Sequence, residues 1–259
     1  MTSLSPVDLA KSSAAQRAVL MVEDGMKVGL GTGSTAVFMV KHLAERVRQE
    51  NLSITAVATS ESTAALARAE GLTVVSLDEA KWLNLTIDGA DEFDDNFNLI
   101  KGGGGALLVE KIVATASDRV VIIADPSKEV DTLGAFPLPI EVIPFGWQTT
   151  KALVEETLVN LDVQGRDSAR RMNGDTPFLT DNGNYILDLQ LKKIANARRL
   201  SLVLNQVPGI VENGLFIDIA DVIVVGAPDG STEIRDLTPE EDPAEPPGPS
   251  NIFSNLVDG

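Results

Sequence analysis

The chain has no cysteine and only one histidine among its 259 residues. The missing cysteines exclude disulfide bonds, thiolate metal sites and cysteine nucleophiles, and they fit a reducing compartment. The one histidine, His42, lies within a predicted helix beside Lys41, so we interpret it as a structural residue. Neither Ser-His-Asp catalysis nor a multi-histidine metal site is therefore expected. Aromatic residues make up only 4% of the chain, so aliphatic residues must build the core.

Long apolar runs and an excess of basic residues are also missing. No apolar segment approaches the roughly 20 residues that cross a bilayer, and the N-terminus lacks the features of a signal peptide. We therefore expect a cytoplasmic protein, or an organelle form after removal of a transit peptide, with no membrane partner. The 21 Lys and Arg against 38 Asp and Glu give a net charge of −17. Such a field repels nucleic acid, so no nucleic-acid partner is expected and any anion site must be local.

Apolar segments of strand length alternate with helical segments in the first half of the chain. Most of these apolar segments lack the alternation of polar and apolar residues that marks a half-exposed strand. This pattern is typical of a parallel sheet buried on both faces, so we expect the α/β class with a doubly wound, mostly parallel sheet. The expected strands are 26–30, 54–58, 72–75, 85–87 and 120–124.

Ligand-binding loops in such sheets follow the carboxyl ends of the strands. Because parallel strands end at one edge, loops from several strands meet there. We therefore expect a single site at this edge. Four segments rich in polar residues or glycine come at the predicted ends, residues 31–35, 59–63, 88–91 and 125–128.

The sequence pattern changes after residue 131. Three prolines, Pro137, Pro139 and Pro144, interrupt an apolar run, which predicts an edge strand or a linker-like passage. The segments that follow predict a smaller α+β unit. It has helices at 147–159 and 196–206 and a hairpin of 178–180 with 185–189 around an Asp-Asn-Gly-Asn turn.

We expect this smaller domain, residues 134–206, to be inserted into a catalytic domain made of residues 1–133 and 207–236. The last segment, 237–259, is acidic and rich in proline, so we predict a flexible tail. The strands that would return to the first sheet after the insertion are 210–211, 221–226 and 232–234.

The segment Gly29–Thr35, GLGTGST, is similar to a dinucleotide-binding fingerprint in its glycines. The acidic residue required after the second strand is missing, because Thr59 and Ser60 stand there, and no Gly-Lys-Ser/Thr follows as in a P-loop. What remains is a glycine loop with three hydroxyls at the start of a helix, which suits a phosphate monoester. The alternative is a tight turn with a Ser or Thr N-cap, and the sequence leaves both open.

Two aspartates begin a segment, residues 88–111, that brings carboxylates, lysines and glycines together. Asp88 and Asp91 flank a Gly-Ala turn, where they serve either catalysis or turn formation. They open an acidic run, residues 88–95, that lacks the spacing of an EF-hand. We therefore rank metal binding below direct catalysis and predict no metal.

A lysine and four consecutive glycines come next. Consecutive glycines carry an entropic penalty on folding, and close approach of the backbone to a ligand explains them best, with Lys101 supplying charge. Glu110 lies in the helix after these glycines. It is either a catalytic carboxylate or an ordinary exposed glutamate.

Seven segments of the chain carry a family resemblance: GLGTGSTA (29–36), TIDGADEFD (86–94), LIKGGGGALLVEKIVA (99–114), IADPSK (123–128), FPLPIEVIP (136–144), TDNGN (180–184) and VPGIVENGLF (207–216). Together they resemble the ribose-5-phosphate isomerase A family over roughly residues 11–234. The resemblance implies interconversion of D-ribose 5-phosphate and D-ribulose 5-phosphate, with no metal and no organic cofactor. It also implies a Rossmann-like larger domain, an inserted ferredoxin-like domain and a homo-oligomer, a dimer or a tetramer.

The resemblance assigns roles to individual residues. Glu110 stands at the position of the catalytic base, and Asp88, Asp91 and Lys101 stand at the other catalytic positions. An aldose–ketose isomerase opens the sugar ring and moves a proton from C2 to C1 through a cis-enediolate, which one carboxylate can do. Lys101 and glycine N–H groups would stabilise the oxyanion, and the two aspartates would move hydroxyl protons in roles that the sequence does not divide. Substrate contacts are expected from Lys11, Gly31, Thr32, Gly33, Ser34, Thr35, Gly89, Ala90, Gly102, Gly103, Gly104 and Lys128.

Two other functions remain as alternatives. A non-enzymatic sugar-phosphate sensor would keep the phosphate loop without a Glu110–Lys101 pair, and it should carry a basic DNA-binding segment, which the sequence does not contain. A CoA-transferase-like enzyme would use a glutamate nucleophile near a glycine-rich loop. Turnover of ribose 5-phosphate distinguishes the isomerase from both.

Overall fold

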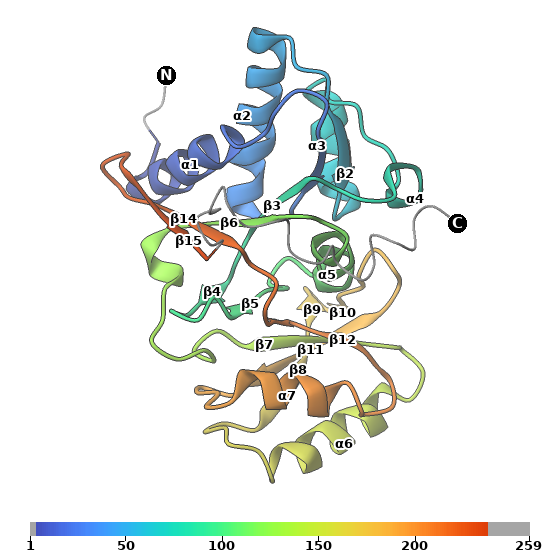
Figure 1. The fold of residues 1–259 in the computed structure, drawn as a ribbon. Coiled ribbons are helices and arrows are strands. Elements are labelled where there is room, and N and C mark those ends of the chain that lie inside the picture. Colours follow the sequence, from blue (N-terminus) through green and yellow to red (C-terminus); the bar gives the residue numbers. More distant parts are fainter. Residues whose placement is uncertain (1–3, 238–259) are drawn as a thin grey trace, which may run out of the picture.

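The computed structural model describes residues 4–237 and shows two domains, one above the other in Figure 1. The upper domain contains the central sheet and its helices, and the lower domain contains a second sheet with two helices on its outer face. The tail predicted for residues 237–259 lies, apart from its first residue, outside the described residues. No helix in the described range is long and apolar enough to cross a membrane.

The central sheet has six strands in the order β15-β14-β6-β3-β1-β2. Neighbouring strands are parallel except for β15, which pairs antiparallel with β14 at one edge. This arrangement confirms the predicted α/β class with a mostly parallel sheet. The strands are β1 (Lys27–Leu30), β2 (Thr55–Ala58), β3 (Leu85–Gly89), β6 (Val120–Ala124), β14 (Val222–Gly226) and β15 (Thr232–Asp236).

Helices cover both faces of this sheet, as the unbroken apolar strands require. Side chains of a strand alternate between faces, and β6 shows the result. Val121 and Ile123 pack with α1 and α2, whereas Val120 and Ile122 pack with α5. The helices of this domain are α1 (Pro6–Val19), α2 (Ser34–Glu50), α3 (Glu61–Ala69), α4 (Leu77–Ala80), α5 (Leu107–Thr115) and the short 3₁₀ helix η1 (Pro126–Lys128).

The smaller domain has the ferredoxin-like order of elements, strand-helix-strand-strand-helix-strand. Its four-stranded sheet has the order β12-β7-β11-β8, and all neighbours are antiparallel. Leucine, isoleucine and valine side chains from the sheet and both helices form its core. Its elements are β7 (Leu138–Val142), α6 (Trp147–Leu158), β8 (Asp167–Arg170), β9 (Met172–Asn173), β10 (Thr176–Pro177), β11 (Tyr185–Gln190), α7 (Ala197–Leu204) and β12 (Ile210–Asn213).

A small three-stranded sheet joins the two domains. It has the order β13-β5-β4, with β4 (Glu92–Phe93) and β5 (Leu99–Ile100) preceding the smaller domain and β13 (Leu215–Phe216) following it. The N–H of Lys101, just after β5, donates to the carbonyl of Gly214 at 2.9 Å. The chain therefore leaves and re-enters the larger domain beside the glycine-rich segment.

Three expected strands differ from the structure. Residues 72–75 form only an isolated bridge between Val74 and Ala56. The proline-rich run is not an edge or a linker, because β7 is buried and lies between β12 and β11. Pro139 lacks an N–H, but its carbonyl still accepts from Gly214 at 2.8 Å, so one missing donor does not exclude it from an interior strand. Residues 210–213 pair with β7 instead of returning to the central sheet, whereas β14 and β15 do return.

The predicted hairpin is right in its turn and in its second strand, 185–189, and wrong in its first strand, 178–180, and in the pairing of the two. Thr180 donates its N–H to the carbonyl of Asn184 at 2.9 Å, which closes the turn. Residues 178–180 form no strand, and β11 instead lies between β7 and β8. Glu141 on β7 holds the turn in place, since its Oε1 accepts from the side chains of Thr180 and Asn184, each at 2.9 Å.

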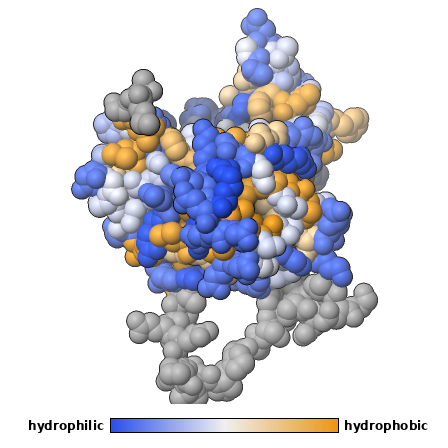
Figure 2. Space-filling model, turned by 90° about the horizontal axis from the view of Figure 1, so that it is seen from above, coloured by the Kyte–Doolittle hydropathy of each residue, from blue (hydrophilic) through white to orange (hydrophobic). Residues whose placement is uncertain are grey.

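The surface carries the acidic and polar residues that the composition predicts. Figure 2 shows a mostly hydrophilic face with separate hydrophobic patches rather than one continuous apolar area. Isolated apolar side chains of this kind are ordinary on a folded protein.

Candidate active site

A small pocket lies at the carboxyl edge of the central sheet, where the loops after β1, β3 and β6 meet the glycine-rich segment after β5. Its volume of about 100 Å³ suits a small polar ligand better than a dinucleotide. Most of the residues that the sequence predicted for the site line it together. They are Lys11, Thr32, Gly33, Ser34, Thr35, Gly89, Ala90, Asp91, Lys101, Gly102, Gly103, Gly104, Glu110 and Lys128.

Lys101 is the buried centre of the ionisable group. Its Nζ lies 2.9 Å from Oδ2 of Asp88 and 3.3 Å from Oε1 of Glu110, and it donates to the carbonyl of Gly89 at 2.6 Å. These three oxygens match the three donors of an ammonium group. The lysine is therefore fully paired although it is only 3% exposed.

Asp88 lies beneath the pocket and not on its wall. Its Oδ1 accepts from the N–H of Gly89 at 2.7 Å and of Thr32 at 3.1 Å. A Cβ on Gly31 would come within 1.9 Å of the same oxygen, so only glycine allows β1 and β3 to end this close together. Gly31 thus lies behind the pocket, where it makes room for the Asp88 carboxylate.

Glu110 lies in the first turn of α5 and is buried. Oε1 faces Lys101, whereas Oε2 has no hydrogen-bond partner among the described residues. Burial raises the pKa of Glu110 to about 8 against the attraction of Lys101, and the nearby Asp88 charge raises it further. The alternative of an ordinary exposed glutamate is therefore wrong, and a buried carboxyl with a free oxygen suits proton transfer near neutral pH.

The three buried charges act on one another. Burial raises the pKa of Asp88 above its usual range, although Lys101 opposes the change. Burial alone would lower the pKa of Lys101, but Asp88 and Glu110 together raise it. The lysine therefore stays cationic, while the two carboxyls compete for a single compensating charge, as expected for coupled titrating groups.

Asp91, unlike Asp88, reaches the pocket. Its Oδ2 accepts from the N–H of Gly103 at 2.7 Å, which ties the loop after β3 to the glycine-rich segment. The two aspartates of the Asp-Gly-Ala-Asp motif thus have different environments, a distinction that the sequence did not provide.

The other end of the pocket is positively charged. Gly33 is the N-cap of α2, with φ of 112° and no side-chain cap bond, so the turn with a Ser or Thr N-cap is not present. The first N–H groups of α2 therefore face the pocket without a capping side chain, and the helix dipole favours an anion there. Nζ of Lys11 donates to Oγ of Ser34 at 2.9 Å, and Lys128 of η1 lines the same pocket.

The acidic run after Asp91 does not converge on a common point. The buried Glu92 accepts from the N–H groups of Gly134, at 2.7 Å, and of Phe136. Asp94 accepts from backbone N–H groups within its own turn. Within residues 4–237, no group of three or more His, Asp or Glu side chains could hold a metal ion.

Residues outside the predicted set also shape the site. Oγ1 of Thr32 lies 2.7 Å from Oγ1 of Thr59 and 2.8 Å from Oγ of Ser60, so the hydroxyl-rich loop after β2 supports the glycine loop from behind. Arg171 of the smaller domain contacts the carbonyls of Gly102 and Gly103. The hydroxyl-rich loop was recognisable as a strand end, whereas nothing local in the sequence distinguishes Arg171.

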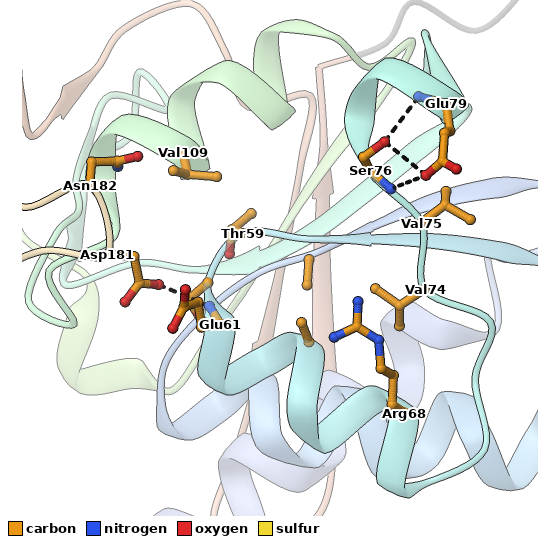
Figure 3. Close-up of a pocket in the computed structure, with 13 residues that line it drawn as sticks. Thr59, Glu61, Arg68, Val74, Val75, Ser76, Glu79, Val109, Asp181 and Asn182 are labelled. Carbon is orange, nitrogen blue, oxygen red and sulfur yellow. Dashed lines mark hydrogen bonds between the residues drawn. The ribbon is translucent and has the colours of Figure 1, made fainter.

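Thr59 and its neighbours line a second, wider cavity of about 750 Å³ (Figure 3). It runs between α3, the segment around α4 and the turn of the smaller domain. The side chain of Asp181 accepts from the N–H of Glu61 at 2.9 Å, so the turn and the start of α3 are joined across one end of this cavity.

Comparison of the sequence and comparison of the structure with known proteins identify one and the same family. The family model of ribose 5-phosphate isomerase A (phosphoriboisomerase A) matches residues 55–230. A ribose-5-phosphate isomerase A of Ruegeria sp. is 63% identical over 98% of both chains, and one of Jannaschia sp. is 67% identical over 90% of this chain and 89% of that protein.

Solved structures agree in fold. A ribose 5-phosphate isomerase from Plasmodium falciparum superposes with a TM-score of 0.83 at 32% identity, over 88% of this chain and 98% of that one. A D-ribose-5-phosphate isomerase in complex with phospho-erythronic acid superposes with a TM-score of 0.82 at 38% identity, over 89% and 99%. The chain therefore belongs to the ribose-5-phosphate isomerase A family.

Proposed function

We propose that this chain interconverts D-ribose 5-phosphate and D-ribulose 5-phosphate in the pocket described above, with Glu110 as the base. The observation that carries the proposal is the buried Glu110 carboxyl. It lies 3.3 Å from Lys101, one of its oxygens has no hydrogen-bond partner within residues 4–237, and Lys11 and Lys128 line the same pocket. In this arrangement Glu110 removes the proton from C2 and returns it to C1, while Lys101 stabilises the enediolate oxygens.

The environments of the two aspartates support a division of roles. Asp91 lines the pocket, so it is the carboxylate that can exchange a proton with a sugar hydroxyl during ring opening. Asp88 is covered by Lys101 and holds that charge in place. Asp88 then acts on the electrostatics of the site and Asp91 on the substrate.

The phosphate is assigned to the cationic end. The uncapped N–H groups at the start of α2, the hydroxyls of Ser34 and Thr35, and the side chains of Lys11 and Lys128 supply donors and charge. This local charge offsets the repulsion that the acidic surface exerts on a phosphorylated sugar. A relative that is 38% identical forms a complex with phospho-erythronic acid, a small compound with a phosphate and a carboxylate, which supports a sugar phosphate as the ligand of this fold.

The two alternative functions fit the site less well. A sensor has no need of a buried carboxyl with a raised pKa beside a buried lysine, because such a pair reduces stability and adds nothing to phosphate recognition. A CoA-transferase must admit a long acyl-CoA chain to its glutamate. The pocket around Glu110 has a volume of only about 100 Å³.

A substrate panel and one substitution test the proposal. We expect turnover of ribose 5-phosphate in a coupled assay for ribulose 5-phosphate, and no CoA exchange. Glu110→Gln should lower kcat more than about 100-fold and leave the affinity for ribose 5-phosphate within about tenfold. Glu50→Gln, which removes an exposed carboxylate of α2, is the matched control and should remain fully active. Activity of Glu110→Gln above about a hundredth of wild type would remove Glu110 from the role of base.

The partners and the compartment predicted from the sequence remain part of this proposal. We infer a homo-oligomer that acts in the cytoplasm on a small sugar phosphate without binding nucleic acid. Light scattering on the full chain after size-exclusion chromatography tests the first point, and a monomer at micromolar concentration would refute it.

A further inference from the structure

The guanidinium group of Arg171 lies between a carboxylate of the smaller domain and the glycine-rich segment of the larger one. Its Nε and Nη2 donate to the two carboxylate oxygens of Asp188 on β11, at 2.9 and 2.5 Å. Its Nη1 donates to the carbonyls of Gly102 and Gly103, at 2.9 and 3.0 Å. The bidentate pair fixes the guanidinium plane, and the remaining nitrogen then holds two consecutive carbonyls.

Holding these carbonyls fixes the opposite side of the same peptide groups. In a planar trans peptide, the carbonyl of one residue and the N–H of the next point in opposite directions. The contacts of Arg171 therefore turn the N–H groups of Gly103 and Gly104 away from the smaller domain. The N–H of Gly103 donates to Asp91, and that of Gly104, which lines the pocket, has no protein acceptor among residues 4–237.

A second contact holds the same segment from the smaller domain. The ring of Phe178 lies so close to Gly105 that a Cβ there would come within 2.5 Å of it, and the Arg171 guanidinium lies 5.7 Å from the centre of the same ring. Without side chains of their own, four glycines have few other means of keeping one backbone conformation. Arg171 and Phe178 supply from the other domain the order that the glycines lack.

We infer that Arg171, held by Asp188, is a positioning residue of the isomerase that orients the N–H group of Gly104 toward the reacting edge of the sugar phosphate, while the N–H of Gly103 holds Asp91. The inference rests on the proposed function, because it assumes that the enediolate forms beside Lys101 and Glu110. It gives the smaller domain, which contributes no side chain to the pocket wall, a part in catalysis. Donors fixed before the reaction stabilise a developing oxyanion more than they stabilise the neutral substrate.

The test compares two neighbouring arginines. Arg171→Gln removes the contacts to the glycine carbonyls. Arg170→Gln removes an equal charge one residue earlier, where the guanidinium stacks 4.4 Å from the ring centre of Trp147 and away from the pocket. We expect Arg171→Gln to lower kcat about 30- to 100-fold with KM within about threefold, and Arg170→Gln to keep kcat within about threefold.

The readout that separates positioning from general stability is the affinity for phospho-erythronic acid. Arg171→Gln should weaken binding of this carboxylate by about the same factor as kcat, while inhibition by inorganic phosphate stays unchanged. Asp188→Asn, which keeps the Arg171 charge but weakens its clamp, should give a smaller loss in the same direction. If Arg171→Gln does not fold, Arg171→Lys replaces it, because lysine keeps the charge without the bidentate geometry.

Several results would overturn the inference. Wild-type kcat in the folded Arg171 variant would do so, and so would a loss of affinity for inorganic phosphate as large as that for phospho-erythronic acid. Equal effects of Arg170→Gln and Arg171→Gln would assign both residues to stability alone. These outcomes differ from a failure of the proposed function, which would appear as activity in Glu110→Gln.

Discussion

Replacing Glu110 with glutamine should weaken catalysis and at the same time stabilise the protein at high pH. The glutamine has the shape of the glutamate without its charge. Lys101 keeps its contacts with Asp88 at 2.9 Å and with the carbonyl of Gly89 at 2.6 Å, so the substitution leaves no unpaired buried cation. The variant therefore removes one buried carboxyl that is forced to ionise as the pH rises.

The magnitude follows from the pKa. Burial raises the pKa of Glu110 from 4.5 to about 8, so the folded protein holds this proton more tightly than the unfolded chain does. The resulting stabilisation is fully present below about pH 4.5 and is lost as the pH rises through about 8. At about 1.4 kcal/mol per pH unit, the full change is at most about 5 kcal/mol. Because Asp88 competes for the same compensating charge, we expect about 2 kcal/mol to belong to Glu110 alone.

Urea unfolding of the wild type and of Glu110→Gln at about pH 5 and about pH 9 measures this difference. The free energy of unfolding of the variant relative to wild type should rise by about 2 kcal/mol between the two pH values. Glu50→Gln, which removes an exposed carboxylate, should show no comparable rise. A difference between Glu110→Gln and wild type that does not change with pH would refute the claim that burial raises the pKa of Glu110.

Three further predictions concern activity. The value of kcat/KM should rise with pH through an apparent pKa near 8, because Glu110 must lose its proton to act as a base. A rise of kcat/KM centred near pH 4.5 instead would exclude a raised pKa for the catalytic base. EDTA should leave the rate unchanged, and loss on chelation with rescue by a divalent ion would indicate a metal site. Lys11→Gln should raise KM for ribose 5-phosphate about tenfold and leave kcat within about threefold. The control Lys81→Gln, which replaces an exposed lysine, should change neither constant. An unchanged KM in Lys11→Gln would exclude Lys11 from phosphate binding.

The central sheet could be predicted from the sequence because its signals are local. Strands such as 120–124 are continuous apolar runs, and the helices between them begin and end at recognisable residues. Three strands of the smaller domain, β8, β9 and β10, were not predicted. The longest of them, β8, reads Asp-Ser-Ala-Arg and has no apolar pattern, and it is a strand because it pairs with β11. For β7 the local signal was misleading. The prolines indicated an edge strand or a linker, but β7 pairs with β12 on one side and β11 on the other and therefore lies inside the sheet.

The site was predictable in its residue types but not in its geometry. Spacing placed Asp88, Lys101 and Glu110 within two dozen residues, yet their burial depends on elements from the whole chain. The difference between Asp88 and Asp91 arises because Lys101 covers only the first. Arg171 could not be found in this way, because its contacts with Gly102 and Gly103 connect residues nearly 70 positions apart.

The small sheet that joins the domains has a consequence for the order in which the protein is made. Every proposed catalytic side chain precedes residue 129, but the backbone of Lys101 is held by Gly214, and β5 pairs with β13, more than a hundred residues later. A ribosome-bound chain that ends before residue 214 would therefore carry all catalytic residues without a fixed Lys101. Activity should appear only once this late segment has left the ribosome, so catalytic competence follows the synthesis of the catalytic residues by more than a hundred residues.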